Sequence, residues 1–200
     1  VAALLAVLAA GAPPVRAQAG KTPEQRKASL DAHKSEFDYL LGDWEFTAES
    51  KQWGKFRGLW SAVRLDEGQI LDECRVLGDQ GETYYVTTTL RNYNAGLDRW
   101  ELIGADAGGG LQDFGTARRE GDEMRIEQTF GVAAGTSSKW RIRYHNIRKD
   151  GFSWTADRST DGGKTWVTGH QTIEARRIGP PRSLPALTTV KKPVTPSPAP

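Results

Sequence analysis

Cysteine is almost absent from this chain, and proline is absent from its long middle. Cys74 is the one cysteine among 200 residues, so no internal disulfide can form and the fold must depend on a packed core. Three prolines fall before residue 24, seven fall from Pro180 onward, and none lies between. Because proline interrupts helices and strand pairing, the proline-free interval is expected to be a single folded domain.

A surplus of one charge sign is also missing. The formal net charge is +2 at pH 7, whereas nucleic-acid surfaces need clustered positive charge, so we expect no nucleic-acid partner. The motifs G-x-S-x-G, H-E-x-x-H and C-x-x-C do not occur. Asp157, Ser159 and Asp161 imitate the start of a calcium loop, but Thr168 stands where that loop needs a bidentate Glu. The sequence therefore predicts neither a metal site nor a cofactor.

Residues 1–19 have the composition of an export signal. Residues 1–12 are uncharged and apolar apart from Gly11, and Ala17-Gln18-Ala19 is a small-x-small cleavage pattern. The initiator Met and a basic leader are missing, so we expect a signal peptide truncated at its start and a secreted or periplasmic protein. The apolar stretch is shorter than the ~20 residues that cross a bilayer, so we expect no integral membrane segment in the mature chain.

A leader helix is predicted over residues 20–41. Thr22 is a suitable N-cap, Pro23 suits the first helical position, and Gln25 completes a capping box. The pattern predicts a helix that runs to about Leu41, with Leu30, Phe37 and Leu41 near one face that could pack against a barrel end.

The hydrophobic period changes to two over residues 42–178. Trp140, Ile142 and Tyr144 alternate with charged residues, which is typical of a strand with one wet face. Glycine-bearing turns every 9 to 15 residues or so leave no room for crossover helices, so the sheet should be antiparallel. We predict an all-β fold, an up-and-down β-barrel of about 8–10 strands after one N-terminal helix, with a two-sheet sandwich as the alternative. Residues 179–200 are proline-rich and predicted to be a disordered tail.

Three stretches carry a resemblance to a known family. They are Phe37-Asp38-Tyr39-Leu40-Leu41-Gly42-Asp43-Trp44, then Leu90-Arg91-Asn92-Tyr93-Asn94 followed by Trp100, and Ser159-Thr160-Asp161-Gly162-Gly163-Lys164-Thr165-Trp166. Over about residues 35–178 the chain resembles an exported bacterial lipocalin-like (calycin) family classified only as a domain of unknown function. The resemblance implies a barrel and export, and no particular activity.

Resemblances to known families imply three local features. In calycins a basic residue after the last strand packs over the Trp of the opening Gly-x-Trp, so Arg176 or Arg177 is expected over Trp44. Some calycin-like barrels hold haem through one His near the last strand, where His170 stands; the alternative is that His170 faces solvent or makes a local hydrogen bond. Residues 159–166 also fit the Asp-box hairpin of sialidase-like propellers, in which Asp161 would accept backbone N–H bonds.

Aromatic and polar residues of several strands could line the barrel interior. The candidate ligand-binding residues are Trp60, Tyr84, Gln128, Trp140, Tyr144, Trp154 and Arg158. Among them Arg158 is the most informative, because a cation inside an aromatic barrel is costly unless an anion or carboxylate meets it. The same aromatic residues could instead fill a solid core, so the sequence leaves open whether the interior is hollow.

The remaining polar candidates have ordinary explanations. Asp72 and Glu73 are adjacent in a strand, point to opposite faces and cannot share one proton-transfer site. Glu73 and Arg75 share a face and are expected to form a salt bridge. Cys74 is expected to be a small buried residue.

The leading hypothesis is an exported barrel that binds a small, partly apolar or anionic ligand. The first alternative is an enzyme of isomerase or hydrolase type that uses the same cavity, with His145 and His170 as the histidines of the barrel. The second alternative is an envelope scaffold protein attached through its tail. The sequence does not settle the oligomeric state.

Overall fold

The computed structural model describes residues 20–66, 68–132 and 135–185. The export signal predicted at 1–19 and residues 186–200 of the predicted tail lie outside the described residues. No described helix is both long enough and apolar enough to cross a membrane.

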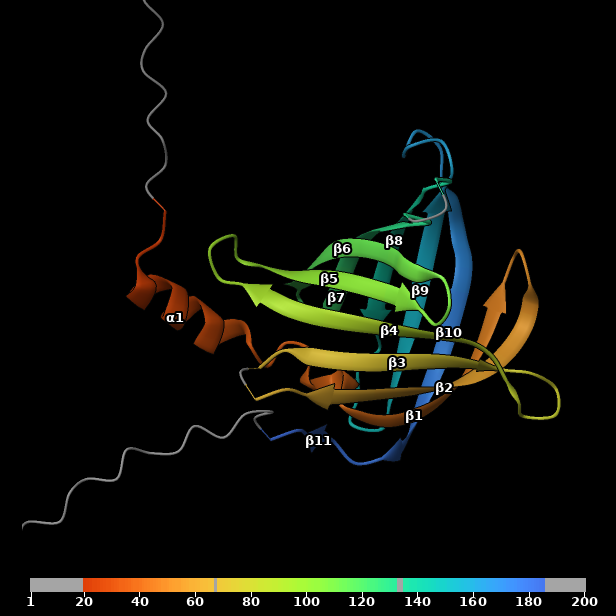
Figure 1. The fold of residues 1–200 in the computed structure, drawn as a ribbon, viewed down its shortest axis with the longest axis horizontal. Helices are drawn as coiled ribbons and strands as arrows, with labels where there is room; N and C mark the ends of the chain where they lie inside the picture. Colours follow the sequence, from red (N-terminus) through yellow and green to blue (C-terminus); the bar gives the residue numbers. More distant parts are fainter. Residues whose placement is uncertain (1–19, 67, 133–134, 186–200) are drawn as a thin grey trace, which may run out of the picture.

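Within these residues, ten strands form one closed antiparallel barrel (Figure 1). Each strand pairs with the next, and β1 also pairs with β10, from Asp43 opposite Gly179 to Ser50 opposite Gln171. The strands are β1 (Gly42–Ser50), β2 (Gly54–Arg64), β3 (Ile70–Leu77), β4 (Thr83–Asn94), β5 (Arg99–Asp106), β6 (Gly110–Glu120), β7 (Glu123–Phe130), β8 (Ser138–His145), β9 (Gly151–Ser159) and β10 (Val167–Gly179). The predicted up-and-down barrel is confirmed, and the sandwich alternative is wrong.

One end of the barrel is closed by aromatic side chains. Trp44, Tyr144 and Phe152 come from three strands, and Phe37 enters from the segment before β1; all four are at most 2% exposed. Phe152 packs edge-on against Trp44, with ring centroids 4.9 Å apart. This closed end therefore contains a fully buried aromatic part of the hydrophobic core.

The leader helix is shorter than the sequence predicts. Helix α1 covers Pro23–His33, and its capping box of Thr22 and Gln25 is present as expected. The chain then turns and forms the 3₁₀ helix η1 (Asp38–Leu40). The prediction of a helix to Leu41 is wrong because Phe37 and Leu40 are fully buried at the barrel end, and α1, which has no buried residue, lies outside the barrel (Figure 1).

The start of the predicted tail is ordered. Strand β11 (Arg182–Ser183) pairs in parallel with Val63 and Arg64 of β2. These two residues extend beyond Gly42, the first residue of β1, which pairs with Ala62, so their edge is free to accept another strand. The prediction of disorder is therefore wrong for Arg182 and Ser183.

Candidate functional site

The end of the barrel opposite η1 is open to solvent. Cys74, Thr87, Thr89 and Gly115 face the interior by their pairing register and the alternation of their strands, yet all four are only partly buried. Deeper interior residues such as Asp72 are fully buried. Solvent therefore reaches the interior through the end formed by the β1–β2, β3–β4, β5–β6, β7–β8 and β9–β10 connections, and we call this part the open half.

A cluster of Trp140, Arg158 and His170 lies in the open half, on β8, β9 and β10. The Trp140 and His170 rings meet edge-on with centroids 5.2 Å apart, and Arg158 Cζ lies 5.8 Å from the Trp140 ring. Trp140 and His170 are 8% and 5% exposed. Trp140 Nε1 donates to Ser138 Oγ at 2.9 Å, and Arg158 Nη1 donates to Gln52 Oε1 at 2.7 Å. We call these three residues the tryptophan–arginine–histidine cluster.

Two nitrogen atoms of this cluster are buried without a partner. Arg158 Nε and His170 Nε2 make no hydrogen bond to any described residue. Burial, together with the charges of Arg158 and Lys51, lowers the pKa of His170 and favours its neutral ring. A buried polar atom without a hydrogen bond costs about 1–3 kcal/mol, so these two atoms form a place where a polar ligand group would be stabilised.

The burial of His170 corrects the expectation that it faces solvent or makes a local hydrogen bond. Strict alternation in β10 puts Ile173 and Ala175 inside, and so would put His170 outside. The pairing of β10 with β9 is irregular between Val167 and Gln171, and Gly169 in that stretch has φ of 54°. The bulge turns His170 inward, and a glycine inside a strand is the sequence signal for such a bulge.

A carboxyl group lies on β6, two strands from Trp140, and contacts Gln128, which is opposite Trp140. Asp113 is 3% exposed and accepts a hydrogen bond from Gln128 Nε2. Burial raises the pKa of Asp113 to about 6, and the hydrogen bond from Gln128 limits this rise. Asp113 can therefore gain or lose a proton near neutral pH. The sequence does not indicate this, because nothing in the residues around a single strand carboxylate shows that its pKa is raised.

Deeper in the interior, Asp72 and Arg91 form a buried ion pair. Arg91 Nε lies 2.6 Å from Asp72 Oδ2, Trp60 Nε1 donates to Asp72 Oδ1 at 2.9 Å, and Arg91 Cζ lies 5.0 Å from the Phe37 ring centre. Burial alone would lower the pKa of Arg91, but the charge of Asp72 raises it overall. Arg91 Nη1 and Tyr39 Oη also lack a partner among the described residues, yet both lie at the closed end.

Most of the residues predicted to line the interior do so. Trp60, Gln128, Trp140, Tyr144 and Trp154 are buried, and Arg158 is half-buried. The structure brings Trp140 and Arg158 together as cross-strand partners, with Gln128 opposite Trp140 on the other side. The ring centroids of Trp60 and Tyr144 lie 5.9 Å apart, and both side chains belong to the packed closed end. Their role in binding stays a prediction.

Tyr84 does not face the interior, and its assignment is wrong. It is 82% exposed. In β4 the odd-numbered residues point inward, because Arg91 must reach Asp72, so Tyr85 takes the inward position. Two adjacent tyrosines give no alternation from which the correct one could be chosen.

Two local expectations are confirmed. Arg177 Cζ lies 4.0 Å from the Trp44 ring centre, while Arg176 pairs with Glu45 on the surface. The Asp161 carboxylate accepts backbone N–H bonds from Lys164 and Thr165 at 2.9 and 3.0 Å, and these bonds, with that from the Thr165 hydroxyl, lower its pKa.

The remaining polar expectations concern β3. Glu73 and Arg75 form a 2.5 Å ion pair on the outer face, and Asp72 points to the opposite side, as expected. Cys74 is inward but only partly buried, and burial raises the pKa of its thiol to about 12, so it is an unreactive residue. In the described ranges, no three His, Cys, Asp or Glu side chains are grouped so that they could hold a metal ion.

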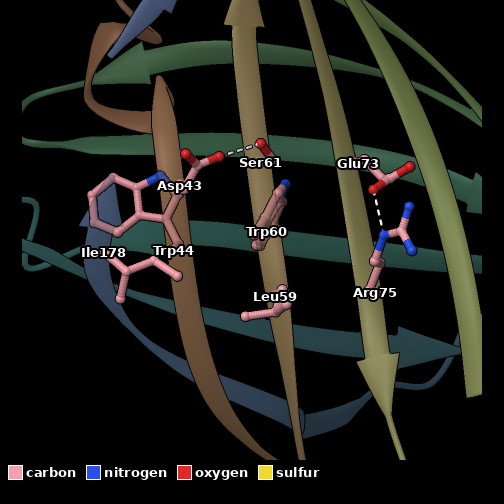
Figure 2. Close-up of a pocket in the computed structure, with 8 residues that line it drawn as sticks. All are labelled: Asp43, Trp44, Leu59, Trp60, Ser61, Glu73, Arg75 and Ile178. Carbon is pink, nitrogen blue, oxygen red and sulfur yellow. Dashed lines mark hydrogen bonds and ion pairs between the residues drawn. The ribbon is translucent and has the colours of Figure 1, made fainter. Parts of the chain in front are cut away.

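Two pockets lie on the outside of the described part of the barrel. One, of about 290 Å³, is lined by residues of β1, β2, β3 and β10, among them Leu59, Ser61, Arg75 and Ile178 (Figure 2). The other, of about 490 Å³, is lined by Tyr39, Ile147, Arg148, Lys149, Arg177, Pro180 and Pro181. Neither includes a residue of the tryptophan–arginine–histidine cluster.

No protein-family model matches the chain, and no curated protein matches it. Among solved structures, the chain is similar to a redesigned beta barrel, with 13% identity, a TM-score of 0.38, and coverage of 70% of this chain and 93% of that one. It is also similar to EF1p2_mFAP2b bound to DFHBI, with 16% identity, a TM-score of 0.34, and coverage of 72% and 98%. Both scores are low, so the barrel assignment stands on the strand pairing of this chain.

Proposed function

We propose that this protein is an exported, lipocalin-like barrel that binds a small, partly apolar and anionic molecule in the open half of its interior. The observation that carries the proposal is the pair of buried, unpartnered nitrogens, Arg158 Nε and His170 Nε2, beside the indole of Trp140. Export is supported by the apolar start of the sequence and its small-x-small pattern at residues 17–19.

The cluster favours an anion over a cation. The charges that act on His170 are those of Arg158 and Lys51, both positive. A carboxylate or sulfonate near Arg158 Nε would gain a charge-assisted hydrogen bond, while a planar apolar part would pack on Trp140 and Phe130, whose ring centroids lie 5.1 Å apart. Few polar groups in a mostly aromatic site are typical of small-molecule pockets.

A matched pair of fluorescent probes tests this. Anilinonaphthalenesulfonate carries an anionic group and N-phenylnaphthylamine does not, while their apolar parts are similar. We expect the folded protein to bind the sulfonate more tightly than the neutral probe. We expect Arg158→Gln to weaken sulfonate binding about tenfold or more without affecting the neutral probe.

Arg143→Gln is the matched control, because Arg143 is on the outer face of β8, where it pairs with Glu123 at 3.6 Å. It should leave both affinities within about twofold. Near-ultraviolet circular dichroism would show that each variant keeps native packing. Equal binding of the two probes, or sulfonate binding that Arg158→Gln leaves intact, would contradict the proposal.

Asp113 supports a second candidate, an enzyme that transfers protons in the same interior. A carboxyl whose pKa is about 6 exchanges its proton readily near neutral pH, as a general acid or base must. Turnover of p-nitrophenyl esters that depends on one group titrating near pH 6 and is lost in Asp113→Asn would support this candidate. If the wild type shows no turnover, and Asp113→Asn still binds the fluorescent probes, the result would favour a binding protein without enzymatic activity.

A further inference from the structure

Five apolar side chains form a continuous ribbon across the outside of the barrel. Val63, Leu71, Leu90, Ile103 and Phe114 come from β2 to β6, and each is directly opposite the next in the strand register. Leu71, Ile103 and Phe114 are 38%, 53% and 52% exposed. With strands about 4.8 Å apart, this apolar ribbon is about 19 Å long.

The same row becomes polar beyond β6. Phe114 pairs with Thr129, Thr129 with Lys139, and Lys139 with Ser159. Since all of these residues occupy equivalent outward positions, the barrel closure does not require an apolar side chain at any of them. The apolar ribbon is therefore a property of one half of the outer surface.

The exposed apolar area matches that of the largest patches on monomers. Phe114 presents on the order of 100 Å², taking about 200 Å² for an aromatic side chain of which 52% is exposed. Ile103, Leu71 and Leu111, which lie on the apolar ribbon or beside it and are 53%, 38% and 45% exposed, add to this. The total falls within the range of about 300–600 Å² seen for the largest patch on a monomer, and such patches often mark interaction sites.

We propose that this outer face of β2 to β6 binds a second copy of the same chain. The charges beside the apolar ribbon are balanced, since Glu73 pairs with Arg75 at 2.5 Å on β3 and Arg99 pairs with Glu101 at 2.8 Å on β5. Charges that are paired in this way beside the apolar ribbon do not repel a second copy, whereas an anionic membrane attracts a surplus of Lys and Arg.

The surface shape of this face is also suited to self-association. The pocket of about 290 Å³ in Figure 2 reaches Leu59 and Arg75 on the same outer face, beyond Ser61 and Glu73, which separate it from the apolar ribbon. Tyr84, on β4, is 82% exposed and projects from this face. In a two-fold interface the same patch serves both partners, so a face that holds both a recess and a projecting side chain can complement itself. A stable dimer buries about 800 Å² per partner, so the interface would include the polar border as well as the apolar ribbon.

Sedimentation velocity between about 1 and about 100 μM tests the proposal on the full chain. We expect a wild-type dimer, and we expect Ile103→Lys and Phe114→Lys each to weaken the dimer about 100-fold, because a buried lysine would lose its hydration. Thr172→Lys is the matched control, since Thr172 is exposed on the outer face of β10, and it should leave the dimer intact. Ile103 and Phe114 are half-exposed, so thermal unfolding should show that their variants fold.

Three results would overturn the proposal. The first is a wild-type protein that stays monomeric at about 100 μM. The second is a dimer that Ile103→Lys and Phe114→Lys leave unchanged, which would place the interface elsewhere. The third is a monomer that co-sediments with phosphatidylglycerol vesicles and is released by either variant, which would assign the face to a lipid surface. None of these measurements depends on the interior ligand.

Discussion

The closed and open halves of the barrel interior are formed by the same strands but differ in whether their charged side chains are paired within the protein. In the closed half Trp44 Nε1 donates to the Leu40 carbonyl at 2.8 Å, and Asp72 is bound by both Arg91 and Trp60. In the open half Arg158 Nε and His170 Nε2 have no partner among the described residues, and Asp113 has its pKa raised by burial. Arg91 Nη1 and Tyr39 Oη in the closed half also lack a partner among the described residues, but Asp72 and Arg91 neutralise each other there. In the open half, neither Arg158 nor Asp113 forms an ion pair with a described residue, and this is where the two halves differ.

This difference shows how stability and binding can be separated in one barrel. The closed half buries Phe37, Trp44, Tyr144 and Phe152, whose packing supplies much of the core. The open half keeps a cation and an imidazole that would destabilise a solid core. A change of charge in the closed half should therefore affect folding, and a similar change in the open half should affect binding.

The largest effect is expected for Asp72→Ala. It would leave the Arg91 charge buried without its 2.6 Å partner and would remove the acceptor of Trp60 Nε1. We expect the free energy of unfolding to fall by about 3–5 kcal/mol, as measured by urea denaturation with tryptophan fluorescence. Arg158→Gln, in the open half, should lower it by less than about 1 kcal/mol.

A double variant separates the charge from the packing. Asp72→Leu combined with Arg91→Met removes both charges, so it should be less destabilising than Asp72→Ala alone. If Asp72→Ala and Arg158→Gln lower the free energy of unfolding by the same amount, the closed and open halves do not differ in this way.

A smaller effect is expected for Arg177→Gln. The guanidinium lies over Trp44 at 4.0 Å and donates to the carbonyls of Leu41, Tyr39 and Lys149 at 2.5, 3.1 and 2.6 Å. Losing the cation–π contact and some of these bonds should lower the free energy of unfolding by about 2–3 kcal/mol in urea. Arg176→Gln removes the neighbouring, exposed arginine and should cost less than about 1 kcal/mol, so equal losses would contradict this role of Arg177.

Features with a local cause could be predicted from the sequence. The capping box at Thr22, the hairpin around Asp161 and the alternation in β8 each depend on residues a few positions apart. The closed barrel follows from the repeated hairpins, because a meander of this length leaves no free edges once it closes. The contact of Arg177 with Trp44 required the family resemblance, since it joins the two ends of the domain.

Features set by long-range pairing could not be predicted. The inward side of β4 depends on Arg91 meeting Asp72, so the sequence alone puts Tyr84 on the wrong face. The inward turn of His170 depends on a bulge between two strands. The end of α1 depends on Phe37 entering the barrel. Each requires the register of a partner that periodicity does not specify.

The smallest effect is expected for Asp113→Asn, and it depends on pH. The pKa of Asp113 in the folded protein, about 6, is above its ordinary value of 3.8, so the folded state binds its proton more tightly than the unfolded state does. The stability that this group contributes is complete below pH 3.8 and is lost as the pH rises through about 6. Above that pH an ionised carboxylate stays buried at a cost of at most about 3 kcal/mol.

The asparagine variant avoids the buried charge but still buries an amide. We therefore expect it to be more stable than the wild type by about 1–2 kcal/mol at pH 8, with the advantage vanishing near pH 4, in urea titrations across that range. The pKa of His170 is lowered, so its contribution to stability has the opposite pH dependence and is lost as the pH falls below 6.5. Because His170 is present in both the wild type and the variant, this contribution cancels in the difference between them. A difference in stability that does not change between pH 4 and pH 8 would show that Asp113 is solvated, and that the open half tolerates charge because water reaches it.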